Sequence, residues 1–179
     1  MSFSNPFGSS GDAIKEYVAS LIARLDGRDP GKVMQGTPGA LRELLSSVSA
    51  GDLMTPEAPG KWSAKGVLVH LLDSEVVYGY RMRFIVAQPE QDIAGYDQDQ
   101  WARALRYEDA PRDLTLDAFG LLRRWNLGWL DSLNDDERAR WGNHSERGHE
   151  SVDHIVKLLA AHDLVHLAQI RRILATVRS

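Results

Sequence analysis

Two histidines near the C-terminal end of the chain, His162 and His166, lie four residues apart within the run HDLVH. On a helix, side chains at positions i and i+4 lie over one another and can share one metal ion. Burying their ring nitrogens without a partner would cost about 1–3 kcal/mol per group. The pair therefore predicts either a divalent metal site or two core histidines hydrogen-bonded to neighbouring helices. The apolar stripe that contains the pair is Ile155, Leu159, His162, His166, Ile170, Ile173 and Val177.

A third histidine, His70, lies in the earlier segment WSAKGVLVHLLD. At about 100° per residue, His70 falls on one flank of an apolar stripe that runs from Val67 to Ile85. On the last helix, His162 falls on a flank as well, so the two flanks could face one another across a groove. Three histidines without a fourth protein ligand are typical of an open, catalytic metal site. The alternative for His70 alone is a core or boundary histidine.

The elements that must position these histidines are helical, because apolar residues recur at spacings of three and four along most of the chain. Four long amphipathic helices predict an all-α fold, an antiparallel four-helix bundle with short additional helices, whose core is the usual place for a metal site. We expect one domain over residues 1–179, with a flexible N-terminus at 1–11, and no strand. The expected helices cover 14–25, 37–48, 63–87, 100–107, 116–133 and 151–177, with residues 27–36 as a break.

Composition excludes several classes of protein. The 179 residues are 43% hydrophobic and 26% charged, as in a soluble globular domain. A net charge of −4 offers no excess of basic residues for contacts with phosphates, and no apolar run is long enough to span a membrane. We therefore expect neither a nucleic-acid nor a membrane partner. The absence of cysteine excludes disulfides, thiolate ligands and a cysteine nucleophile. The first residues do not have the pattern of a secretory signal, so we expect a cytoplasmic protein.

The segments around the three histidines resemble the DinB/YfiT-like superfamily of metalloenzymes. The resemblance extends over roughly residues 29–175 and keeps the order and helical settings of the histidine motifs. The matching stretches are WS…HLLD at 62–73, GYDQDQW at 95–101, Asn126, His144…Gly148 and HDLVHLAQI at 162–170.

This resemblance implies a four-helix bundle, commonly a homodimer, and one divalent metal, most often zinc or nickel, held by His70, His162 and His166. It also implies a small-molecule substrate. Characterised members include transferases and isomerases that use an external low-molecular-weight thiol, and other members are named metal-dependent hydrolases. A metal with an open position could lower the pKa of bound water towards about 7 or bind and deprotonate a thiol. A non-enzymatic metal-binding or stress-associated bundle is the alternative.

Four further residues are candidates for the pocket. Asp163 follows His162 and could act as a general base, or orient an imidazole from outside the metal's ligands. Asn126 interrupts an apolar stripe, so it is a pocket residue or a satisfied core amide. Arg81 could hold an anionic substrate group, or its chain could cover the edge of the core while its charge reaches solvent. His144 could reach the metal or substrate, or be a plain loop histidine.

Overall fold

The computed structural model describes the backbone of residues 11–177 and the side chains from Ala13 onward. Four long helices form a bundle: α2 (Pro30–Leu45), α4 (Ala64–Ala87), α6 (Arg112–Leu130) and α8 (Val152–Val177). This confirms the predicted all-α four-helix bundle. The segment 1–11 that was expected to be a flexible N-terminus lies outside the described residues, except for residue 11.

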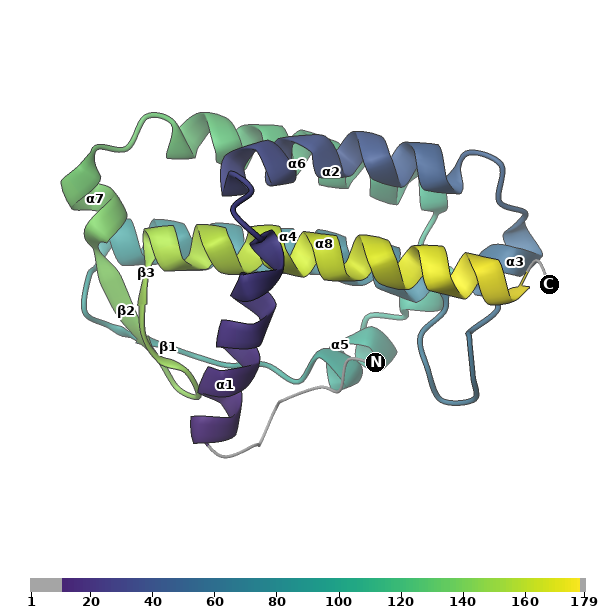
Figure 1. The fold of residues 1–179 in the computed structure, drawn as a ribbon, viewed down its shortest axis with the longest axis horizontal. Helices are drawn as coiled ribbons and strands as arrows, with labels where there is room; N and C mark the ends of the chain where they lie inside the picture. The colour runs from purple at the N-terminus through teal and green to yellow at the C-terminus, as the bar shows by residue number, and fades with distance from the viewer. Residues whose placement is uncertain (1–10, 178–179) are drawn as a thin grey trace.

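Neighbours in the bundle are not neighbours in the chain. Helix α8 packs against α2 and α4, and α6 packs against α4 and α2, so α2 lies diagonally opposite α4. Figure 1 shows α2 and α8 running in one direction and α4 and α6 in the other. Each helix therefore has one antiparallel and one parallel neighbour, which corrects the expectation that the bundle is antiparallel throughout. The connection from α4 to α6 is long enough to return the chain to the end from which α4 started.

Shorter elements cover the sides and ends of the bundle. Helix α1 (Gly11–Ile22) continues into a 3₁₀ turn, η1 (Ala23–Leu25), and lies across α8 (Figure 1). Helix α3 (Ala50–Met54) joins α2 to α4. The long connection after α4 contains β1 (Asp92–Ile93), α5 (Gln98–Ala104) and η2 (Tyr107–Asp109), and α7 (Asp135–Ala139), β2 (Trp141–His144) and β3 (Gly148–Ser151) follow α6.

The three short strands correct the expectation that the chain has no strand. They form one sheet in the order β1-β2-β3, with β1 parallel and β3 antiparallel to β2. Each strand has four residues or fewer, which is too short for the alternation of polar and apolar residues that reveals a strand in a sequence. The hairpin of β2 and β3 occupies the segment just before α8.

The start of α2 is a second correction, because the helix begins at Pro30 and not at residue 37. The side chain of Asp29 accepts a hydrogen bond from the backbone of Lys32 at 2.8 Å, and Pro30 occupies the first turn, where a proline is tolerated. Pro38, the second residue of the helix expected at 37–48, lies inside α2. Since proline has no backbone N–H, the carbonyl of Met34 loses its helical hydrogen bond and is free for another donor.

The other helix boundaries are closer to expectation. Helix α5 begins two residues early because Asp97 caps it, and α6 begins after Pro111 and ends at Leu130. Serine side chains cap the starts of α4 and α8: the hydroxyl of Ser63 accepts a hydrogen bond from Gly66, and that of Ser151 accepts one from His154, each at 3.1 Å.

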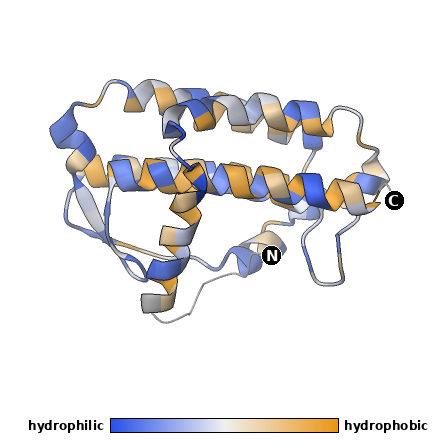
Figure 2. Cartoon of the chain, in the orientation of Figure 1, coloured by the Kyte–Doolittle hydropathy of each residue, from blue (hydrophilic) through white to orange (hydrophobic). Residues whose placement is uncertain are grey.

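The core consists of two apolar clusters with a polar layer between them. One cluster contains the end of α4 and the first half of α8, and the other contains the start of α4 and the second half of α8. Figure 2 shows apolar and polar residues alternating along these helices. Between the clusters, each of the four helices contributes a buried polar side chain: Thr37, Glu75, Arg123 and Asp163. This layer is where the candidate site lies.

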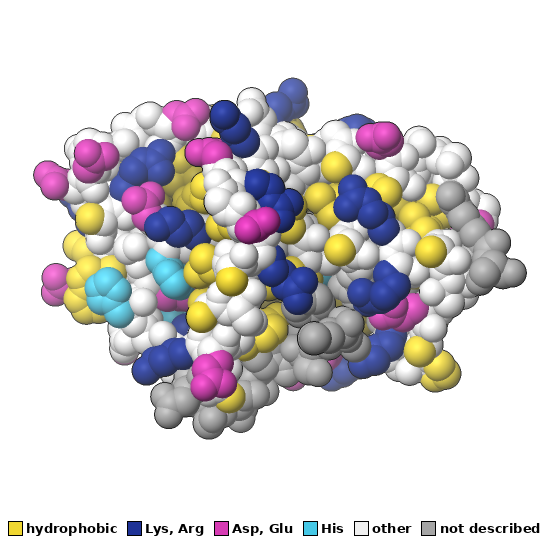
Figure 3. Space-filling model, viewed as in Figure 1, with side chains coloured by type: hydrophobic (Ala, Val, Ile, Leu, Met, Phe, Trp, Pro, Cys, Tyr) yellow, Lys and Arg dark blue, Asp and Glu magenta, His cyan; other side chains and the backbone are white. Residues whose placement is uncertain are grey.

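The surface is mixed in character. On the face drawn in Figure 3, basic side chains lie among acidic, apolar and uncharged ones. No helix within residues 11–177 is both long and apolar enough to cross a membrane.

Candidate metal centre

The three histidines come from two neighbouring helices. His162 and His166 are one turn apart on α8, and His70 lies on the facing side of α4. His70 and His166 are buried and His162 is partly exposed. The i,i+4 spacing that singled out the pair therefore has the expected consequence, since both rings point towards the same partner helix.

The side-chain nitrogens of the three histidines converge. The Nε2 atom of His162 lies 3.0 Å from that of His70 and 3.0 Å from that of His166, and all three rings offer a nitrogen within 4.8 Å of the others. Within the described residues this is the group of His, Asp and Glu side chains whose arrangement could hold a metal ion. Trp62 packs against the ring of His70, with 4.8 Å between the ring centroids.

Burial keeps these imidazoles neutral. It lowers the pKa of His70 and of His162 well below the usual value, and the neighbouring His166 lowers both further. Burial lowers the pKa of His166 to about 4, although its hydrogen bond to Gln169 acts in the opposite direction. Neutral imidazole is the form that binds a metal ion.

The hydrogen bond between His166 and Gln169 also fixes a tautomer. The Nδ1 atom of His166 lies 2.7 Å from Oε1 of Gln169, so that Nδ1 carries the proton and donates it. Its Nε2 lone pair is then directed at the other two rings. A ring N–H bonded to a carbonyl-type oxygen is the usual arrangement behind a metal-binding histidine. Gln169 is a residue to which the sequence assigned no role.

These residues fit a divalent ion. A tetrahedral ion with metal–nitrogen bonds of about 2.0–2.1 Å holds neighbouring ligand nitrogens about 3.3 Å apart. The two separations of 3.0 Å from His162 to His70 and to His166 are close to this value. Three neutral imidazoles with converging lone pairs cannot satisfy one another by hydrogen bonds alone. The Nδ1 atoms of His70 and His162 are buried without a hydrogen-bond partner among the described residues, so the cluster is not a satisfied core.

A small cavity of about 80 Å³ opens beside the cluster. His70 and His162 form part of its wall, α1 covers it with Ile14, Tyr17, Val18 and Leu21, and Tyr78, Arg81 and Tyr96 line it as well. Ser74 links two of these groups: its hydroxyl lies 3.5 Å from Nε2 of His70 and hydrogen-bonds to Tyr96. Burial raises the pKa of Tyr96 to about 12, so its phenol remains protonated at neutral pH.

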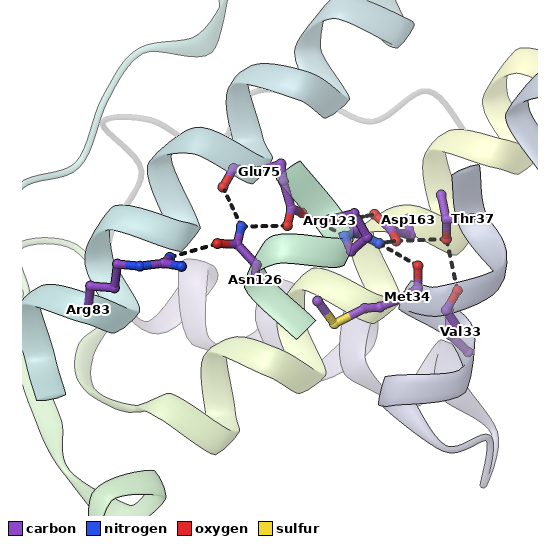
Figure 4. Close-up of polar contacts among 8 residues, drawn as sticks. All are labelled: Val33, Met34, Thr37, Glu75, Arg83, Arg123, Asn126 and Asp163. Atoms are coloured by element: carbon purple, nitrogen blue, oxygen red, sulfur yellow. Dashed lines mark hydrogen bonds and ion pairs between the residues drawn. The ribbon is translucent and has the colours of Figure 1, made fainter. Parts of the chain in front are cut away.

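A buried ion-pair network lies in the same polar layer, as Figure 4 shows. The guanidinium of Arg123 donates to Glu75 at 2.7 Å and, through two nitrogens, to Asp163 at 2.5 and 3.1 Å. It also donates at 2.9 Å to the Met34 carbonyl, the group that Pro38 leaves without its helical bond. The hydroxyl of Thr37 donates a further hydrogen bond to the carboxylate of Asp163 at 2.7 Å.

This network determines where two of the candidate residues lie. Both oxygens of Asp163 accept hydrogen bonds from Arg123 and Thr37, and no hydrogen bond joins it to an imidazole of the described chain. The arrangement gives no support to a general base or an imidazole-orienting role. Asn126 donates to Glu75 at 2.7 Å and accepts from Arg83 at 2.6 Å, so the structure favours the alternative reading, a satisfied core amide.

The two remaining candidates, Arg81 and His144, lie outside the ion-pair network. Arg81 lines the cavity next to His70 and His162, as a pocket residue should. His144, at the end of β2, accepts a hydrogen bond from the backbone of Glu146 at 3.2 Å and does not line this cavity. Burial, with the nearby charge of Arg147, lowers its pKa to about 3. It is thus a buried, neutral histidine of the hairpin rather than a plain loop histidine.

Several residues of this region escaped the sequence analysis. Glu75 and Arg123 occupy positions that face the bundle interior, and a charged residue at such a position is the signal that could have found them. Ser74 and Tyr96 gave no comparable signal, because a serine within a helix and a tyrosine in a loop are common.

The sequence matches the profile of the DinB superfamily over residues 34–170, a span that includes all three histidines. The chain belongs to the DinB superfamily. The family resemblance expected from the histidine motifs is therefore confirmed.

Individual relatives agree. A protein of Oceanobacillus iheyensis is 25% identical over 137 residues, 76% of this chain and 79% of the relative. One from Bacillus cereus strain 03BB102 is 26% identical over 138 residues, with the same shares covered. Each bears the name "Putative metal-dependent hydrolase".

Among solved structures, YfiT from Bacillus subtilis aligns with a TM-score of 0.75 and 21% identity, covering 89% of this chain and 86% of its own. It is described as "a probable metal-dependent hydrolase with an unusual four-helix bundle topology". At this level of identity the likeness confirms the fold.

Proposed function

We propose that this DinB-superfamily protein is a metal-dependent hydrolase of a small molecule, with one divalent ion held by His70, His162 and His166. The observation that carries the proposal is the convergence of three neutral imidazole nitrogens at the wall of a cavity. The names of the relatives and the family match support the same function.

The donor set suits zinc or nickel, since imidazole nitrogens bind both. When bound, such an ion supplies Lewis-acid chemistry, which polarises a scissile carbonyl or phosphoryl group and activates water. With three protein ligands, a fourth position remains for the reactants.

The surrounding residues have separate tasks in this proposal. Gln169 holds the ring of His166 in one tautomer and orientation. Trp62 packs on His70 and shields that side of the cluster from solvent. The protonated phenol of Tyr96, hydrogen-bonded to Ser74, can donate a hydrogen bond to an oxygen that gains negative charge in the cavity.

Two alternatives remain predictions. A transferase would use an external low-molecular-weight thiol as its nucleophile, because the chain has no cysteine. A non-enzymatic bundle would use the metal only to brace α4 against α8. The small-molecule substrate, the homodimer, the absence of a nucleic-acid or membrane partner and the cytoplasmic location likewise stay predictions.

The first experiment measures metal content per chain by elemental analysis of tag-free protein. We expect about one equivalent of zinc or nickel in the wild type and loss of the metal in His166→Ala. His149→Ala, which changes an exposed histidine of the hairpin, is the matched control and should keep the metal. Wild-type protein without metal, even after reconstitution with zinc and nickel, would overturn the proposal.

A second experiment separates the hydrolase from its alternatives. The metal-loaded protein is incubated with chromogenic ester, amide and phosphoester panels, and in parallel with an electrophilic aryl halide plus glutathione, bacillithiol or mycothiol. Hydrolysis that His166→Ala abolishes supports the hydrolase. Turnover only in the presence of a thiol favours the transferase, and neither activity in protein with a full complement of metal favours the non-enzymatic bundle.

A further inference from the structure

Arg81 is a buried cation that forms no ion pair with a carboxylate of the described residues. Only 3% of the residue is exposed. Its Nη2 atom donates to the neutral backbone carbonyl of Ala94 at 2.6 Å, and its Nη1 atom has no hydrogen-bond partner among the described residues. Burial accordingly lowers the pKa of this guanidinium. A buried charge left unpaired is costly, and a structure rarely retains one without a use.

The other buried arginines nearby make the contrast clear. Arg147 binds both oxygens of Glu150, at 2.5 and 2.9 Å, and Arg123 binds two carboxylates. Each of these two guanidinium groups has a carboxylate partner. The half-buried Arg83 has none: it donates to the Gly79 carbonyl and to Asn126, and its Nη2 atom has no hydrogen-bond partner among the described residues. Among the described residues, Arg81 is the arginine that lines the cavity beside the histidines without a carboxylate partner.

Two aromatic rings hold the guanidinium of Arg81 in place. Its central carbon lies 5.3 Å from the centroid of the Tyr78 ring and 5.7 Å from that of Tyr96. Contacts of this kind fix a planar cation without neutralising it. A guanidinium held in this way, with free N–H groups, is suited to bind a carboxylate or phosphate group.

Arg81 and Tyr96 also line a second hollow on the outer side of α4. This groove of about 450 Å³ is largely apolar, and its walls include Tyr80, Phe84 and Trp101. Arg81 and Tyr96 belong to both hollows, so they stand between the histidine cavity and the groove. A ligand that reaches the histidines past Arg81 could place an apolar portion in this groove.

The acidic residues of the region limit the charge of the ligand. Glu146 also lines the histidine cavity, and Glu150 lies close enough to Arg81 to affect its pKa. In the metal-free protein, Glu146 would repel the second charge of a dianion such as a phosphate monoester, because Arg147, another arginine of the cavity wall, is already bound by Glu150. A single negative charge can pair with Arg81. The site thus favours a monocarboxylate.

We infer that Arg81 is the recognition residue for an organic monocarboxylate with an apolar arm, which binds with its carboxylate at Arg81 and its arm in the groove of Tyr80, Phe84 and Trp101. This deepens the proposed function, on which it rests for the reaction itself. The carboxylate subsite can be tested without the reaction, because binding at Arg81 does not require the metal.

The test measures binding of 4-phenylbutyrate, its uncharged analogue 4-phenylbutyramide, and inorganic phosphate by calorimetry. Both the metal-loaded protein and the protein stripped of metal by EDTA are used, since a carboxylate could otherwise bind the ion. We expect the carboxylate to bind about 10- to 100-fold more tightly than the amide, with phosphate weaker, in both preparations. Equal binding of carboxylate and amide by the metal-free protein would overturn the inference.

Variants locate the subsite. Arg81→Met should abolish the preference for the carboxylate over the amide, while Arg124→Met, an exposed arginine of α6, should keep it. If Arg81→Met does not fold, Tyr80→Ala replaces it, because Tyr80 is 65% exposed and its removal should not disturb the core. Tyr80→Ala should weaken 4-phenylbutyrate but not acetate, and unchanged binding there contradicts the proposed groove.

The outcomes also separate this inference from the proposed function. Preferential carboxylate binding by a protein that never takes up metal would leave the subsite standing and remove the hydrolase. A metal-loaded hydrolase without a carboxylate preference would do the reverse.

Discussion

Two polar clusters are buried in the same layer of this bundle, and they differ in how well they are satisfied. In the Glu75–Arg123–Asp163 network, charged groups bind one another and the Met34 carbonyl. In the histidine cluster, three nitrogens converge and two other ring nitrogens lack partners among the described residues. The comparison indicates that the network holds the helices together, whereas the histidines are arranged for something that binds to them.

The largest expected effect is at the centre of the network. Arg123→Met leaves two fully buried carboxylates without their cation, so we expect a loss of about 3–5 kcal/mol in the free energy of unfolding. Urea denaturation followed by circular dichroism measures this loss. Arg124→Met, at the neighbouring exposed position, is the control and should change the stability little.

Removing the charges together sharpens this prediction. The triple variant Arg123→Met, Glu75→Gln, Asp163→Asn no longer buries an unpaired charge and should recover part of the loss. If Arg123→Met alone costs no more than a surface substitution, the network is not what stabilises this layer.

The histidine cluster should respond to pH. In the folded, metal-free protein the pKa of His166 is about 4, against a usual value of 6.5, so the unfolded chain takes up protons first as the pH falls. The free energy of unfolding should therefore fall as the pH drops below about 6.5, by about 2 kcal/mol at pH 5 from His166 alone. His70 and His162 act in the same direction.

Denaturation in EDTA at pH 7.5, 6 and 5 checks this sign and size. His166→Gln removes one of the titrating groups, so its stability should depend less on pH over this range. A wild type whose stability is constant from pH 7.5 to 5 would contradict the neutral, buried histidines of the structure.

The smallest expected effect tests whether the histidine cluster depends on its hydrogen bond to Gln169 and not on the ion-pair network. Gln169→Leu removes the acceptor for the His166 ring, and the affinity for zinc should fall about 10-fold or more while the fold is kept. Competition with a chromogenic chelator measures the affinity. Thr37→Val, which removes a hydrogen bond from the ion-pair network, should leave zinc affinity unchanged, and an equal loss in both variants would mean that the two clusters are not distinct.

Local signals in the sequence determined much of the architecture. Apolar stripes predicted α4, α6 and α8, whereas the expected helix at 37–48 covered only part of α2. Ser63 and Ser151 lie at the starts of α4 and α8, and the spacing of His162 and His166 predicted two of the three converging ligands. These signals work because helical periodicity and capping depend on residues only a few positions apart. The third histidine needed the additional guide of the family resemblance, since nothing local relates α4 to α8.

Only the tertiary structure decided which polar residues belong to the site and which to the scaffold. Asp163 is adjacent to His162 in sequence, yet it pairs with Arg123, forty residues away, because successive helical residues point in different directions. The unpaired charge of Arg81 became visible only in the structure, where no carboxylate of the described residues forms an ion pair with it. Pro38 supplies the clearest case: by itself it suggests the start of a helix, but within α2 it frees the Met34 carbonyl that Arg123 binds. Such pairings depend on which helices meet, and that is decided by packing of the whole chain.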